Sequence, residues 1–83
     1  MPSFRVLVTV TLKPEILDPA GQATHQVLQH LGYAVDNVRI GRIVTLTVEA
    51  DDANSARGVA ERMAQDILAN PIMESFECQV DLS

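Results

Sequence analysis

Residues 34–50, AVDNVRIGRIVTLTVEA, decide the fold, because one glycine, Gly41, interrupts an otherwise strand-like segment. If the chain turns at Gly41 the segment is a hairpin, and if it does not the segment is one long strand. A type I′ turn needs positive φ at both central residues, which suits neither Ile40 nor Arg42. Gly41-Arg42 is compatible only with a type II′ turn.

The spacing of the apolar residues favours a single strand. The apolar residues before and after the glycine are all even-numbered: Val38, Ile40, Val44, Leu46 and Val48. A slip of one residue would turn a whole face over, so this unbroken parity predicts one strand of about 16 residues, kinked or bulged at Gly41. Such a strand is much longer than the common five or six residues, and its overhang would leave unpaired backbone for a second copy of the chain to pair.

Two more strands are predicted at the ends of the chain. Residues 4–13, FRVLVTVTLK, alternate apolar and polar side chains, as a half-buried strand does. Residues 74–83, ESFECQVDLS, alternate in the same way, and four of them are expected to face inward: Phe76, Cys78, Val80 and Leu82.

Two amphipathic helices separate these strands. The first is expected to begin with Asp18 as N-cap and Pro19 at the first helical position, and to end near Leu31 with Gly32 after it. The second is expected to begin at Asp51 or Asp52 and to end at Asn70-Pro71. Its predicted apolar stripe consists of Ala56, Val59, Ala60, Met63, Ile67 and Leu68.

The whole chain, residues 1–83, is therefore predicted to be one α+β domain. We expect a two-layer β-α-β-α-β sandwich with a long central strand bent at Gly41 and two helices on one face of an antiparallel sheet. The alternative is a ferredoxin-like β-α-β-β-α-β sandwich, which requires a turn at Gly41. An 83-residue domain rich in aliphatic side chains also favours burial against another chain, which predicts a homodimer or homotetramer.

Composition argues against several classes of protein. The net charge is −5 and none of the six Lys and Arg residues is adjacent to another, so no basic stripe is available for nucleic acid. No apolar run approaches the ~20 residues of a membrane span. With one cysteine, Cys78, and no leader-like segment, the expected location is the cytoplasm.

No catalytic, cofactor-binding or metal-binding residues are predicted on this chain. His25 and His30 are five residues apart, so they point to different sides of a helix and do not form a metal-binding pair. Cys78 is expected to pack as a small apolar residue. The four glycines are too dispersed for a phosphate loop, and capping explains the Asp51-Asp52 pair.

Two segments are candidates for contact with a partner. The loop KPEILDPAG, residues 13–21, is richer in proline, charge and aliphatic side chains than capping requires. Arg39 and Arg42 flank Gly41 and are suited to an anion or a partner's carboxylate, or else act as edge charges that discourage strand pairing. The candidate interface residues are Lys13, Pro14, Glu15, Ile16, Leu17, Asp18, Arg39, Gly41 and Arg42.

The blocks LKPEILDPAG, LGY, VRIGR and LANPIMESF, in this order, resemble the PurS family along the whole chain. That family is the small subunit of phosphoribosylformylglycinamidine (FGAM) synthase, a glutamine amidotransferase of the ligase class in purine biosynthesis. The resemblance implies an assembly subunit without catalytic residues, which joins a large synthase subunit to a glutaminase subunit and helps contain ammonia transfer. It also implies that ATP and Mg²⁺ bind the synthase subunit, and no cofactor binds this chain. A different class of protein, a small metabolite-binding regulatory domain of ferredoxin-like type, is the alternative.

Overall fold

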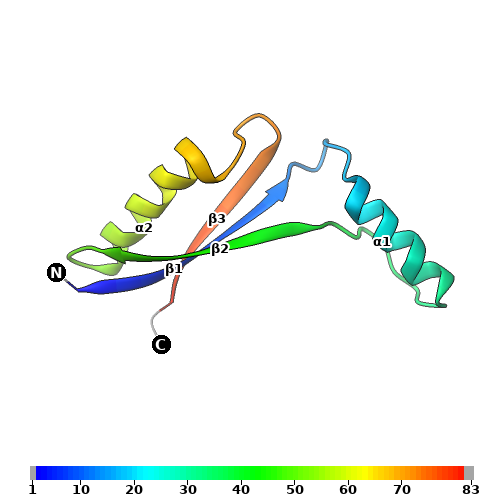
Figure 1. The fold of residues 1–83 in the computed structure, drawn as a ribbon, viewed down its shortest axis with the longest axis horizontal. Helices are drawn as coiled ribbons and strands as arrows, with labels where there is room; N and C mark the ends of the chain where they lie inside the picture. The colour runs from blue at the N-terminus through cyan, green and yellow to red at the C-terminus, as the bar shows by residue number, and fades with distance from the viewer. Residues whose placement is uncertain (1, 82–83) are drawn as a thin grey trace.

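A computed structural model describes residues 2–81 and shows three strands and two helices (Figure 1). The elements in chain order are β1 (Ser3–Leu12), α1 (Pro19–His30), β2 (Gly41–Glu49), α2 (Ala53–Met63), the π-helical turn η1 (Ala64–Leu68) and β3 (Glu74–Asp81). β1 lies in the middle of the sheet and pairs antiparallel with β2 on one side and β3 on the other. The α+β class and the β-α-β-α-β order are therefore confirmed, and the ferredoxin-like alternative is excluded for the described residues.

Gly41 neither turns the chain nor bends a long strand; it begins β2. The prediction of a strand of about 16 residues is wrong, since β2 has 9 residues and lies at one edge of the sheet. Gly41 pairs with Thr11, almost at the end of β1, so residues before Gly41 have no neighbouring strand to pair with. Asn37 adds a break, because its φ of 56° lies in the left-handed region.

The core lies between one face of the sheet and α2. Val6, Val8 and Val10 of the central strand are fully buried, and the helix meets them with small side chains, Ala56 and Ala60. Alternation along β1 and β3 and the predicted apolar stripe of the second helix, apart from Ile67, are thus confirmed. Leu82, predicted to face inward, lies outside the described residues.

The predicted stripe fails at Ile67, whose side chain is 82% exposed. Residues Ala64–Leu68 form a π-helical turn that ends with the Ala69 N–H donating to the Ala64 carbonyl oxygen (2.9 Å). A π turn spans five residues instead of four, so it changes which side chains face the sheet. Ala64 and Ala69 are buried, and Ile67 is rotated to the surface.

Both predicted ends of α1 and the predicted start of α2 are confirmed, whereas α2 itself stops at Met63, where η1 follows it. Asp18 caps α1, Pro19 follows it, and Gly32 closes the helix with a φ of 95°. Of the two predicted caps for α2, Asp52 is the one used, and its Oδ1 accepts the Ser55 N–H at 2.7 Å.

The expectation that both helices cover one face of the sheet is wrong for α1. Only α2 packs on the sheet, whereas α1 lies beyond the end of the strands (Figure 1). The chain is consequently elongated, 51 × 30 × 13 Å, and its radius of gyration is 15.9 Å. A compact domain of this length would have a radius of gyration of about 12 Å. The periodicity of the sequence predicted that α1 is amphipathic. It did not predict whether the apolar face of α1 packs on the sheet.

Candidate functional site

The apolar face of α1, formed by Ala20, Ala23, Val27 and Leu31, belongs to a helix that makes no extensive contact with any other helix or strand among residues 2–81. The Val27 side chain is 58% exposed and the Leu31 side chain 67%. All extensive contacts between elements of the described chain are among the strands, α2 and η1. A helix that exposes several large apolar side chains on one face is typical of a surface that binds another protein chain.

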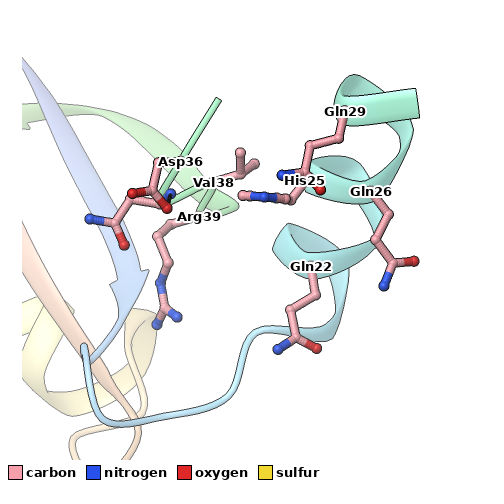
Figure 2. A pocket seen from close by; sticks show the side chains of 8 residues that line it. Gln22, His25, Gln26, Gln29, Asp36, Val38 and Arg39 are labelled. Carbon is pink, nitrogen blue, oxygen red and sulfur yellow. Dashed lines mark hydrogen bonds between the residues drawn. The ribbon is translucent and has the colours of Figure 1, made fainter. Parts of the chain in front are cut away.

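The opposite face of α1 is polar and borders a shallow groove of about 450 Å³. Figure 2 shows the side chains of Gln22, His25, Gln26 and Gln29 on the helix, opposite residues 36–39. His30 is not among the residues lining this groove, in agreement with the prediction that the two histidines point to different sides of the helix. Within residues 2–81 no group of three or more His, Cys, Asp or Glu side chains is arranged to hold a metal ion.

Asp18 joins α1 to the segment that leads into β2. Its side chain is almost completely buried (4% exposed). The Gly21 N–H donates to Oδ1 at 2.9 Å, and the Ile40 N–H donates to Oδ2 at 2.7 Å. The hydrogen bond from Ile40, then that from Gly21 and the charge of Arg39, lower the pKa of the Asp18 carboxyl below its usual value. The predicted cap is therefore also a bridge between two connecting segments.

Arg39 also joins the segment before β2 to the segment between β1 and α1. Its Nη2 donates to the carbonyl oxygens of Lys13 (2.9 Å) and Ile16 (3.0 Å). Both acceptors lie in the connector between β1 and α1. Arg39 is thus engaged within the chain, and its predicted role in binding an anion or a partner's carboxylate stays a prediction.

Arg42 is likewise engaged within the chain. It forms a bidentate ion pair with Glu74, at 2.6 Å and 3.2 Å, and its Nη2 donates to the Leu68 carbonyl oxygen at 2.6 Å. Glu74 also accepts the Asn70 N–H at 2.7 Å. The Arg42 hydrogen bond, followed by that from Asn70, lowers the pKa of the Glu74 carboxyl. This network links the start of β2 to the end of η1 and the turn before β3.

The Glu74 network predicts a pH dependence of stability. A carboxyl whose pKa is lowered by folding stabilises the native state above its ordinary value, 4.5, and this contribution is lost as the pH falls through the lowered pKa. Glu74→Gln is expected to lower Tm at pH 7 and to converge with the unsubstituted protein at acid pH. Thermal unfolding followed between pH 7 and pH 2.5 checks this. Glu77→Gln, on the opposite face of the same strand, is the control, and an equal effect there would contradict the assignment.

The loop 13–18 is only partly free for a partner. The Lys13 side chain donates to the Pro71 carbonyl oxygen at 3.0 Å, and Asp18 is buried. Pro14 and Glu15 are exposed, and the Leu17 side chain is 64% exposed, whereas Ile16 is half-buried. Pro14, Glu15 and Leu17 are therefore the members of the predicted interface set that a partner can reach most readily.

Comparison with known proteins accounts for this arrangement. A family model described as "PurS: Phosphoribosylformylglycinamidine (FGAM) synthase" matches residues 5–82. The chain belongs to the PurS family. The PurS subunit of FGAM synthase from Synechocystis is 43% identical over 75 residues, which are 89% of this chain and 75% of that protein.

Solved PurS structures share the elongated fold. The PurS subunit of Thermotoga maritima superimposes with a TM-score of 0.90 at 27% identity, over 96% of this chain and 93% of that one. A chain in the structure of PurLQS from the same organism superimposes with a TM-score of 0.89 at 28% identity, over 98% and 100% of the two chains. The position of α1 beyond the sheet is therefore compatible with the fold of these two solved PurS chains.

Sequence reasoning missed two features of this PurS-family chain. It assigned Ile67 to the core, and no local signal marks a π turn. It also treated Asp18 only as a cap, although the second acceptor bond reaches Ile40, 22 residues away. The burial of an aspartate in a loop offers no sequence signal, because a cap and a bridge use the same residue type.

No helix among residues 2–81 has the length and apolar character needed to cross a membrane.

Proposed function

We propose that this chain is the PurS subunit of an FGAM synthase complex in purine biosynthesis and acts there as an assembly subunit. The observation that carries the proposal is its superposition, over nearly its whole length, on a chain of the PurLQS structure. The curated relatives that match, including the Synechocystis protein, are named as subunits of the same synthase. The enzyme is a ligase, located in this proposal in the cytoplasm.

In this proposal the chemistry belongs to the other subunits. A large synthase subunit holds ATP and Mg²⁺ and activates phosphoribosylformylglycinamide, and a glutaminase subunit releases ammonia. The chain joins them and helps contain the ammonia. Its isolated glycines support this division, because a phosphate loop needs clustered glycines before a helix.

The exposed face of α1 supports self-association as part of the same proposal. A dimer or tetramer would bury Val27 and Leu31, which the single chain leaves in water. Association would also cover part of the large surface of the single chain, which is elongated and has a radius of gyration of 15.9 Å. Pro14, Glu15 and Leu17, at the base of α1, are the residues proposed to contact the larger subunits.

Reconstitution tests the proposed function. Purified synthase and glutaminase subunits are expected to form FGAM from glutamine only when this chain is added. Ammonium chloride in place of glutamine provides the control, because it supplies nitrogen without the glutaminase. Glutamine-dependent turnover that is unchanged when the chain is omitted would refute the proposal.

A further inference from the structure

The orientation of α1 relative to the sheet depends on very few interactions. Two connectors link α1 to the rest of the chain: residues 13–18, which leave β1, and residues 31–40, which lead into β2 (Figure 1). The extensive packing within the described chain does not include α1. Hydrophobic packing, which usually fixes a helix on a sheet, is therefore not what holds this one.

The two connectors are joined at the base of α1 by polar side chains. The Asp18 carboxylate accepts two backbone N–H groups, that of Gly21 in α1 and that of Ile40 in the second connector. Arg39 donates from the second connector to two carbonyl oxygens of the first. The Asp18 carboxylate is buried, where hydrogen bonds to a charged group are strong and costly to lose. We call Asp18, Gly21, Arg39 and Ile40 the clasp.

Gly21 shows how closely the parts of the clasp approach one another. A Cβ atom at this position would lie 2.5 Å from Asp18 Oδ2 and 2.5 Å from the Val38 carbonyl oxygen. Only glycine leaves room for the second connector to pass the first turn of α1 at this distance. The crossing is therefore a specific packed junction and not a loose linker.

We propose that the clasp sets the direction of α1, so that Asp18 and Arg39 are positioning residues for its apolar face. Loss of the hydrogen bonds of Asp18 or of Arg39 would leave α1 folded and the sheet packed on α2. The angle between α1 and the sheet would then vary. The consequence for the synthase rests on the proposed function, because a second copy of this chain would meet the apolar face of α1 in the right orientation only part of the time, and less of the assembled form would be available to the larger subunits. If the correct orientation fell to about a tenth of the population, the apparent affinity would fall about tenfold.

The test separates bridging from capping. Asp18→Ser keeps a good helix cap but has one short oxygen, which cannot serve both Gly21 and Ile40. Asp52→Ser is the matched control, because Asp52 caps α2 through Ser55 in the same way and, among the residues that the structure describes, its side chain forms no hydrogen bond to a distant segment. Arg39→Ala is the second variant, at an exposed position where the substitution is expected to leave the fold intact. Far-UV circular dichroism checks that every variant keeps its helices.

Spin labels measure the direction of α1. They are attached at Gln29→Cys on α1 and Glu77→Cys on β3, in a Cys78→Ala background, and the labelled chain is diluted with unlabelled chain so that distances are within one molecule. We expect one narrow distance in the unsubstituted and Asp52→Ser proteins, and its loss in Asp18→Ser and Arg39→Ala. A narrow distance in both clasp variants, a broad one in the unsubstituted protein, or equal broadening in Asp52→Ser would overturn the proposal.

Reconstitution distinguishes this proposal from the proposed function. The concentration of the Asp18→Ser chain that gives half-maximal glutamine-dependent turnover is expected to rise about tenfold, with the same maximal rate. An unsubstituted chain that fails to support turnover would refute the proposed function, while the distance measurement would still decide the clasp. If the unsubstituted chain supports full glutamine-dependent turnover and the distances in the clasp variants are unchanged, only the proposal about the clasp is refuted.

Discussion

The double substitution Val27→Glu and Leu31→Glu is expected to abolish the proposed self-association of the chain. The two residues lie one helical turn apart on the apolar face of α1 and are both more than half exposed in the single chain. An interface on this face would have to bury two unpaired carboxylates, which costs several kcal/mol. The association constant is therefore expected to fall by at least about a hundredfold. In the described part of the chain, the sheet and α2 make no extensive contact with α1, so the fold should remain.

Light scattering after size-exclusion chromatography measures the effect across a range of protein concentrations. Gln22→Glu with Gln29→Glu is the matched control, because it adds the same charge to the opposite, polar face of α1 (Figure 2). The control is expected to keep the oligomeric state of the unsubstituted protein. If the control dissociates and the Val27 and Leu31 variant does not, the chain uses the other face of the helix.

Alanine at Gly21 and alanine at Gly58 are expected to change stability in opposite directions. Alanine in a helix is ordinarily better than glycine by about 0.5–1 kcal/mol, and Gly58 in α2 has open space around its Cβ position. Gly58→Ala is therefore expected to stabilise the protein by this amount. At Gly21 a Cβ would lie 2.5 Å from a backbone oxygen of the second connector, so Gly21→Ala is expected to destabilise the protein by about 1–3 kcal/mol.

Thermal unfolding at one fixed protein concentration checks both changes, because association would otherwise shift Tm. For a chain of this size each kcal/mol corresponds to about 4–8 °C in Tm. The two variants are thus expected to differ by several degrees and to lie on opposite sides of the unsubstituted protein. A rise in Tm for Gly21→Ala would mean that the connectors do not cross as closely as the clasp requires.

Interactions that are local in sequence made much of the fold predictable. The alternation in residues 4–13 and 74–81 depends only on which side of a strand each residue faces, and it gave the correct buried face of the central strand. Asp18, Pro19 and Gly32 act on backbone groups within a few residues, so the ends of α1 were predictable. The unbroken parity through Gly41 correctly favoured a chain without a hairpin there, although it overestimated the length of β2.

The candidate site was predictable only in part. The loop 13–18 and the two arginines were singled out for their unusual composition, and the loop does meet Arg39 at the base of α1. Arg42 instead binds Glu74 and the Leu68 carbonyl oxygen. The side chains of both arginines therefore bind the chain's own backbone and Glu74, leaving Pro14, Glu15 and Leu17 as the surface a partner can reach. Composition shows that a segment is unusual, but it does not show which groups become satisfied within the fold.

The sequence by itself determined the order of the elements, the faces of the strands and the ends of the helices, because each depends on neighbours a few residues away. The tertiary structure alone decided that α1 lies beyond the sheet, that Ile67 faces solvent, and that Asp18 reaches Ile40. The physical reason is that an amphipathic helix specifies a need for an apolar partner without specifying whether its own chain provides it. Here the apolar face of the sheet packs against α2, and hydrogen bonds at the base of α1 position that helix instead.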